Sequence, residues 1–169
     1  SKAKEWNINP TRVGATGGSA GACTSLWLAL HDDLADPDSS DPIARQSSRL
    51  TCAAVDGAQT SLDPKELREW IANSIYGGHA FEFAAPKRTR PEEFELLIAN
   101  REQVLPWIKE FSPIELVTPD DPPIYLDYPN QKTPPVLGQV EKDPTHSAIY
   151  GIQLVEKLKA SNVEGVVAY

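Results

Sequence analysis

Residues 11–30, TRVGATGGSAGACTSLWLAL, decide the fold that the sequence predicts. Thr11 to Thr16 is a short strand-like run, and the glycine-rich stretch from Gly17 to Gly21 that follows it predicts a tight turn. Apolar residues then recur with helical spacing at Cys23, Leu26, Trp27, Leu28 and Leu30. The stretch therefore predicts a strand, a tight turn and a helix in direct succession.

Three further strands are predicted over residues 49–58, 124–128 and 163–169. The first of them, RLTCAAVDGA, is apolar without alternation, which favours a strand in a parallel sheet that is covered on both faces. A helix is predicted over residues 149–160, between the last two strands. Strands separated by helical crossovers indicate an α/β fold, with a parallel sheet of about four strands and flanking helices.

A small helical insertion is predicted within this fold, over about residues 64–111. Asp63 and Pro64 are typical of an N-cap and a first helical turn, and residues 91–99 and 102–111 have helical periodicity. Pro106 predicts a kink or the start of a separate short helix. With 169 residues in all, we expect residues 1–169 to form a single domain.

Composition excludes several classes of protein. No apolar run approaches the ~20 residues that cross a bilayer, so a membrane-spanning protein is not expected. A net charge of −8, from 16 Lys and Arg against 24 Asp and Glu, disfavours nucleic-acid binding. Cys23 and Cys52 are expected in the core, and no metal or cofactor is predicted. The sequence leaves the cellular compartment open.

The chemistry of the chain is expected at Gly17-Gly18-Ser19-Ala20-Gly21. A Gly-x-Ser-x-Gly motif between a strand and a helix is typical of a nucleophile elbow, in which small residues allow the strand and the helix to approach closely. Ser19 is then the nucleophile, and the backbone N–H of Ala20 helps to bind an oxyanion. The alternative, a phosphate-binding loop, lacks both the Lys-Ser/Thr pair and the dinucleotide glycine spacing.

With this motif the chain resembles the α/β-hydrolase family, and in particular its esterase and lipase branch with Gly-Gly-Ser-Ala-Gly elbows. Residues 7–16 (NINPTRVGAT) look like the segment that enters the nucleophile strand, and residues 112–128 look like the stretch that leads into the acid-bearing strand. The helix at 149–161 and the strand at 163–169 are similar to the last crossover of that fold. The resemblance implies a partial α/β-hydrolase fold that corresponds to the C-terminal half.

The resemblance also implies a catalytic acid and a catalytic histidine. The usual acid position after the third strand reads Pro129-Asn130, so the acid would be Asp127 within the strand, which we take forward, or Asp143 in the loop beyond it. His146 is the histidine in the right chain order, although it precedes the final helix. His31 and His79 are expected to be structural. No His-Gly-Gly loop for a second oxyanion donor occurs in the 169 residues.

Two functions follow from these expectations. The first is a carboxylic ester hydrolase of small-molecule esters, with an acyl-enzyme on Ser19 and residues 64–111 as a cap. Six aromatic residues could line the acyl pocket or pack the helices, namely Trp70, Tyr76, Phe81, Phe83, Phe94 and Trp107. The alternative is a catalytically silent module that self-associates through an exposed sheet edge. The exposed edge leads us to expect a homo-oligomer, specifically a homodimer.

Overall fold

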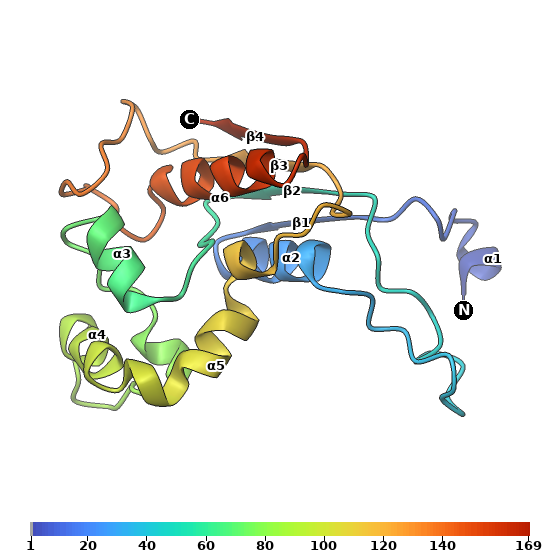
Figure 1. Cartoon of the computed structure of the whole chain (residues 1–169), viewed down its shortest axis with the longest axis horizontal. Helices are drawn as coiled ribbons and strands as arrows, with labels where there is room; N and C mark the ends of the chain where they lie inside the picture. Colours follow the sequence, from blue (N-terminus) through green and yellow to red (C-terminus); the bar gives the residue numbers. More distant parts are fainter. Residues whose placement is uncertain (1) are drawn as a thin grey trace.

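The computed structural model describes residues 2–169, and Figure 1 shows how its elements are arranged. Its helices are α1 (Ala3–Trp6), α2 (Ala20–Leu30), α3 (Pro64–Trp70), α4 (Arg90–Ala99), α5 (Arg101–Phe111) and α6 (Ile149–Ala160), with short 3-10 helices η1 (Gly78–Phe81) and η2 (Pro113–Leu116). Its strands are β1 (Gly14–Gly18), β2 (Cys52–Asp56), β3 (Ile124–Asp127) and β4 (Gly165–Ala168).

The four strands form one parallel sheet in the order β1-β2-β3-β4. This confirms the predicted α/β fold with a four-stranded parallel sheet, although β1 extends through Gly18 into the predicted turn and the other three strands are shorter than predicted. Gly18, Asp56 and Asp127 are in register across the first three strands. The carboxyl ends of all the strands therefore meet at one edge of the sheet, on the left in Figure 1.

One face of the sheet is covered by α2 and α6. Residues of both helices share a core with Ala53, Val55, Ile124 and Leu126, which point to that face from β2 and β3. The other face is open in residues 2–169, since Cys52, Ala54 and Tyr125 are exposed. The prediction of a sheet covered on both faces was therefore wrong for this part of the chain, where both flanking helices lie on the same side.

The segment between β2 and β3 forms the predicted helical insertion, with a small apolar core of its own. That core consists of Leu62, Phe81, Leu97, Val104 and Ile108. Asp63 caps α3 by accepting from the N–H of Lys65, and it pairs with Arg101 at the start of α5. Pro106 lies inside α5, which continues through it to Phe111 rather than ending there.

Both cysteines are free, and neither is fully buried. Cys23 is half-buried on α2, and Cys52 is exposed on the open face of the sheet. The prediction that both lie in the core was therefore wrong for Cys52. Its apolar neighbours in β2 suggested burial, but only alternate residues of the strand face the helices.

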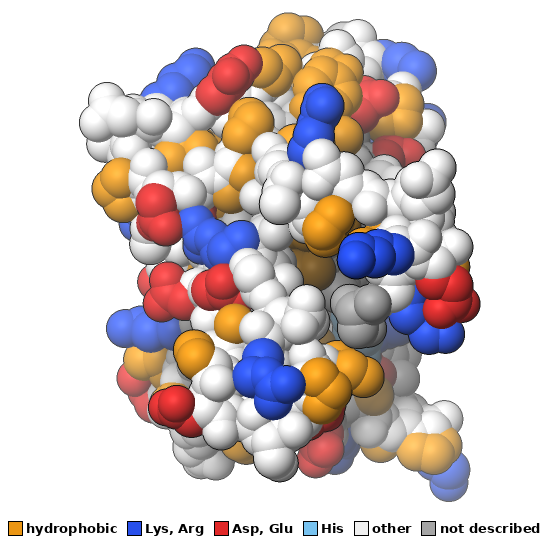
Figure 2. Space-filling model, turned by 90° about the vertical axis from the view of Figure 1, so that its right-hand side faces the viewer, with side chains coloured by type: hydrophobic (Ala, Val, Ile, Leu, Met, Phe, Trp, Pro, Cys, Tyr) orange, Lys and Arg blue, Asp and Glu red, His pale blue; other side chains and the backbone are white. Residues whose placement is uncertain are grey.

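The surface at the amino-terminal ends of the strands carries charges of both signs. Figure 2 shows this end of the molecule, where Lys and Arg side chains are interspersed with Asp and Glu and with hydrophobic residues. In the described part of this face, Lys and Arg side chains form no continuous stripe of the kind that binds a phosphate backbone. Among residues 2–169, no helix is both long enough and apolar enough to cross a membrane.

Candidate active site

Ser19 occupies a sharp turn between β1 and α2. Its backbone has φ 52° and ψ −117°, a region that residues with a side chain rarely adopt. The N–H of Ser19 donates to the carbonyl of Asp56 at 2.9 Å, which fastens the turn to the end of β2. The residue is exposed at the carboxyl edge of the sheet. A nucleophile elbow requires a strained backbone of this kind at its serine.

The glycines of the motif have different steric roles. A Cβ on Gly17 would lie 2.5 Å from the backbone of Gly21, so the strand and the helix touch at this point. A Cβ on Gly18 or on Gly21 would meet nothing within 4 Å among the described residues. The expected close approach is therefore present, but in this chain it requires glycine only at position 17.

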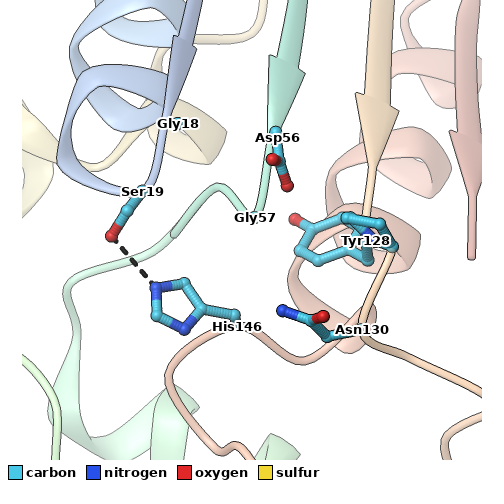
Figure 3. Close-up of a pocket in the computed structure, with 8 residues that line it drawn as sticks. Gly18, Ser19, Asp56, Gly57, Tyr128, Asn130 and His146 are labelled. Atoms are coloured by element: carbon cyan, nitrogen blue, oxygen red, sulfur yellow. Dashed lines mark hydrogen bonds between the residues drawn. The ribbon is translucent and has the colours of Figure 1, made fainter.

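The imidazole of His146 lies next to the Ser19 hydroxyl. Its Nε2 is 3.0 Å from Ser19 Oγ, within hydrogen-bonding distance, as drawn in Figure 3. His146 comes from the long loop between β3 and α6, and its ring packs against Gly57, which follows β2 with φ +57°. The structure thus brings together two residues that are 127 positions apart in the sequence.

The second ring nitrogen of His146 faces a carboxylate. His146 Nδ1 is 2.9 Å from Oδ2 of Asp143, while Oδ1 accepts from the N–H groups of Thr145 and His146. Partial burial opposes the charge of Asp143, but the hydrogen bonds from His146 and Thr145 outweigh it, so the pKa of Asp143 lies below its ordinary value. A neutral imidazole that donates from Nδ1 to Asp143 accepts at Nε2 from Ser19.

The structure places Asp143, and not Asp127, against the histidine. Asp127 ends β3 on the same side of the strand as Tyr125, the side that faces away from the helices. No hydrogen bond between Asp127 and His146 occurs within residues 2–169. The choice of Asp127 as the acid therefore does not match the geometry. Asp127 is held on β3 by the sheet, whereas Asp143 lies in the same loop as His146 and only three residues before it.

Ala20 offers a backbone N–H next to Ser19. It is the first residue of α2, where the N–H groups have no partner within the helix. Its N–H makes no backbone hydrogen bond elsewhere in the described chain. A helix N-terminus also favours negative charge. The role of Ala20 as an oxyanion donor stays a prediction.

A cleft surrounds the Ser19–His146 pair. Its inner part, about 220 Å³, is lined by Gly18, Ser19, Asp56, Gly57, Tyr128, Pro129, Asn130 and His146. A larger lobe of about 850 Å³ adjoins it at Asn130 and His146 and contains Lys132, Glu141 and Lys142. Figure 3 shows Asp56 and Asn130 at the border of the inner part. None of the six aromatic residues predicted as lining contributes to either part.

The remaining predicted residues lie outside this cleft. His31 contacts Glu110 at 3.3 Å and stacks on Trp27, and His79 packs edge-on against Tyr76. Among the aromatic residues, Trp70, Phe81 and Phe94 are buried, whereas Trp107 is 58% exposed. Within residues 2–169, no cluster of three or more His, Cys, Asp or Glu side chains could hold a metal ion.

Sequence reasoning missed one feature that the sequence contains. Asp143 and His146 are three residues apart, and an Asp side chain at this spacing can cap a turn that places both side chains on one side. The spacing was therefore a signal for an acid and a base in the same loop. No comparable signal indicated that Gly57 packs against the imidazole or that Asn130 lines the cleft. Both contacts depend on how the ends of the strands meet in the folded chain.

Solved structures with a similar fold are esterases and related hydrolases. An acetyl ester-xyloside bifunctional hydrolase from Caldicellulosiruptor lactoaceticus matches with a TM-score of 0.63 and 19% identity, over 98% of this chain and 48% of that one. An esterase from Thermogutta terrifontis matches with a TM-score of 0.58 and 18% identity, over 99% of this chain and 46% of that one. A truncated carbohydrate esterase from gut microbiota matches with a TM-score of 0.58 and 17% identity, over 98% of this chain and 53% of that one.

These matches confirm the predicted resemblance at the level of the fold. The chain spans about half the length of the solved structures that it matches. By sequence, no family model and no curated protein matches it.

Proposed function

We propose that this chain, which has a partial α/β-hydrolase fold, carries the catalytic residues of a carboxylic ester hydrolase. Ser19 is the nucleophile, His146 the general base, and Asp143 the acid that orients the imidazole. The observation that carries the proposal is the unbroken series of contacts from Asp143 through His146 to Ser19, at 2.9 and 3.0 Å. The series ends on a serine in a strained elbow, where such strain is common at functional sites.

The reaction follows from these contacts. His146 Nε2 accepts the hydroxyl proton as Ser19 Oγ bonds to the ester carbonyl carbon, and the carbonyl oxygen becomes an oxyanion near the N–H of Ala20. The carbonyl re-forms as the alcohol leaves with the proton from His146, and the acyl group stays on Oγ. Water then attacks the acyl-enzyme by the same route, with His146 again as base, and releases the acid.

The cleft supports a small and polar ester as the substrate. The inner part has room for a short acyl group beside Ser19, while the larger lobe offers lysine, glutamate and amide groups to a polar alcohol. The name of one structural neighbour includes an acetyl ester, and that of another a carbohydrate esterase. We propose short acyl esters as the substrate class. We also propose the helical insertion as a cap beside the cleft.

The test combines turnover with covalent labelling. The wild-type protein should hydrolyse p-nitrophenyl acetate and react with a fluorophosphonate probe, and Ser19→Ala should lose both. Ser40→Ala, which removes an exposed serine outside the cleft, is the matched control. Equal hydrolysis by Ser19→Ala and wild type, or labelling that persists in Ser19→Ala, would contradict the proposal.

A second candidate function is a silent module that self-associates, and the open sheet favours it. β1 is an edge strand, and the uncovered face presents Tyr125 and Val166, which are 45% and 46% exposed. Such an edge and face favour pairing with another chain, so a homodimer remains part of the proposal. Sedimentation velocity at two concentrations tests it. A single monomeric species at both concentrations would eliminate self-association, independently of the labelling result.

A further inference from the structure

The loop that carries Asp143 and His146 has little regular structure of its own. It extends from Tyr128 to Ala148 and contains no helix or strand among the described residues. Its β-type pairing is limited to an isolated bridge between Ile71 and Gln139. Side-chain amides take the place of a strand or helix in holding it. Gln59, Asn73 and Gln131 all hydrogen-bond to backbone groups of this loop. The base of the proposed triad is therefore held by side chains rather than by secondary structure.

Of these three amide side chains, Gln59 contacts the loop at the position nearest to His146 in the sequence. Its Nε2 donates to the carbonyl of Thr145 at 2.8 Å and to the carbonyl of Gly57 at 3.1 Å. Thr145 immediately precedes His146, and Gly57 is the residue against which the imidazole packs. One amide group thus fixes both the residue before the base and the surface behind its ring.

The same amide connects the base to the nucleophile. Gln59 follows β2, and the last residue of β2, Asp56, accepts the backbone N–H of Ser19. A short path of hydrogen bonds therefore runs from Ser19 through the end of β2 and Gln59 to Thr145. Because Gln59 is completely buried, water cannot replace its two bonds.

The orientation of the amide is also determined. Gln59 Oε1 is buried without a hydrogen-bond partner among the described residues. Exchanging the oxygen and the nitrogen would place the oxygen against two carbonyl groups, which repel it. The side chain therefore leaves its acceptor unused and serves this site through its donors.

We propose that Gln59 is a positioning residue that sets the separation between Ser19 Oγ and His146 Nε2. The inference rests on the proposed function and adds to it a residue that touches neither substrate nor reacting atoms. Without the two donors, the carbonyls of Gly57 and Thr145 lose their common partner, and the loop is free to move away from the end of β2. Displacement of a catalytic group by 1 Å costs about 100-fold in rate.

The test replaces the donors without changing the length of the side chain. Gln59→Met removes both N–H groups, and Thr60→Val is the matched control. The hydroxyl of Thr60 is also buried and also donates to a carbonyl, that of Tyr150 in α6, at 2.8 Å. Both variants lose a buried hydrogen bond, so both should unfold at a lower temperature than wild type. Only Gln59→Met should slow fluorophosphonate labelling of Ser19, by about 10- to 100-fold.

A second measurement does not depend on activity. In the wild type, ¹⁵N NMR of the imidazoles should show an Nε2 signal, assigned to His146 by its loss in His146→Ala. Its position depends on the hydrogen bond with Ser19 Oγ and should move in Ser19→Ala. In Gln59→Met this signal should move toward its position in Ser19→Ala, and in Thr60→Val it should stay where it is in the wild type. If Gln59→Met fails to fold, Gln59→Glu replaces it. Burial keeps its carboxyl protonated, and the single O–H can serve only one of the two carbonyls, so a smaller change in the same direction is expected.

The outcomes separate the two proposals. A moved Nε2 signal in the Gln59 variant, with no labelling of wild type, would support the positioning role and contradict the proposed hydrolase. An unchanged Nε2 signal in a folded Gln59 variant would overturn the positioning role. Equal labelling rates for Gln59→Met and Thr60→Val would overturn it too, even if the wild-type protein hydrolyses esters.

Discussion

The elbow at Ser19 and the loop around His146 hold their functional side chains by different means. At the elbow, contacts within a few residues fix the backbone, with Gly17 touching Gly21 and Ser19 in a strained conformation. In the loop, hydrogen bonds from distant segments hold an irregular backbone. The difference teaches that the proposed nucleophile is placed by local sterics, whereas the proposed base is placed by polar side chains that come together only in the folded chain.

The largest effect should come from breaking the acid–base pair inside the loop. Asp143→Asn leaves the size of the side chain unchanged but removes the charge that favours the Nδ1 proton of His146. We expect the rate of ester hydrolysis to fall by about 1,000-fold or more. Asp127→Asn, the matched variant on β3, should retain the wild-type rate. If Asp127→Asn is the more damaging of the two, the acid has been assigned to the wrong element.

The next largest effect tests whether the elbow depends on sterics. Gly17→Ala places a methyl group against the backbone of Gly21, at a distance that the backbone cannot tolerate without moving. Overpacking of this kind costs about 1–3 kcal/mol, which urea unfolding can measure. Gly18→Ala, with open space around the added carbon, should have nearly the stability of wild type. Similar free energies of unfolding for both variants would argue against a steric origin.

A smaller effect should come from the outer tether of the loop. Asn73 accepts from the N–H of Glu141 at 3.0 Å and donates to its carbonyl at 2.9 Å. Asn73→Ala should lower the free energy of unfolding by about 1 kcal/mol, and it should slow hydrolysis less than Gln59→Met does, because Glu141 is farther along the chain from His146 than Thr145 is. If Asn73→Ala hydrolyses esters more slowly than Gln59→Met, then Asn73 contributes more than Gln59 to holding His146 in place.

The smallest effect concerns acid stability. Because the pKa of Asp143 is lower in the folded chain than its ordinary value of about 3.9, its ionised form stabilises the fold above that pH. This contribution is lost as pH falls through the lower, folded-state value. Asp143→Asn should therefore lose less stability than wild type between about pH 4 and pH 2. Urea unfolding across that pH range measures the free energy of unfolding of both proteins. If the two free energies fall in parallel as the pH falls, the stabilising role of the Asp143 charge is contradicted.

The predictability of the two regions differs for the same reason. The Gly-rich turn, the strand before it and the helix after it are local patterns, so the sharp turn at Ser19 and the parallel sheet could be predicted from the sequence. The partner of His146 could not be decided, because the choice between Asp127 and Asp143 depends on where a long loop folds back. The exposure of Cys52 was missed as well, since apolar composition does not reveal which face of a sheet is covered.

The spacing of three residues between Asp143 and His146 has a mechanical consequence. Carboxylate and imidazole belong to one turn, so a motion of the loop carries both together and leaves their contact intact. What such a motion changes is the gap to Ser19, which lies on a different element.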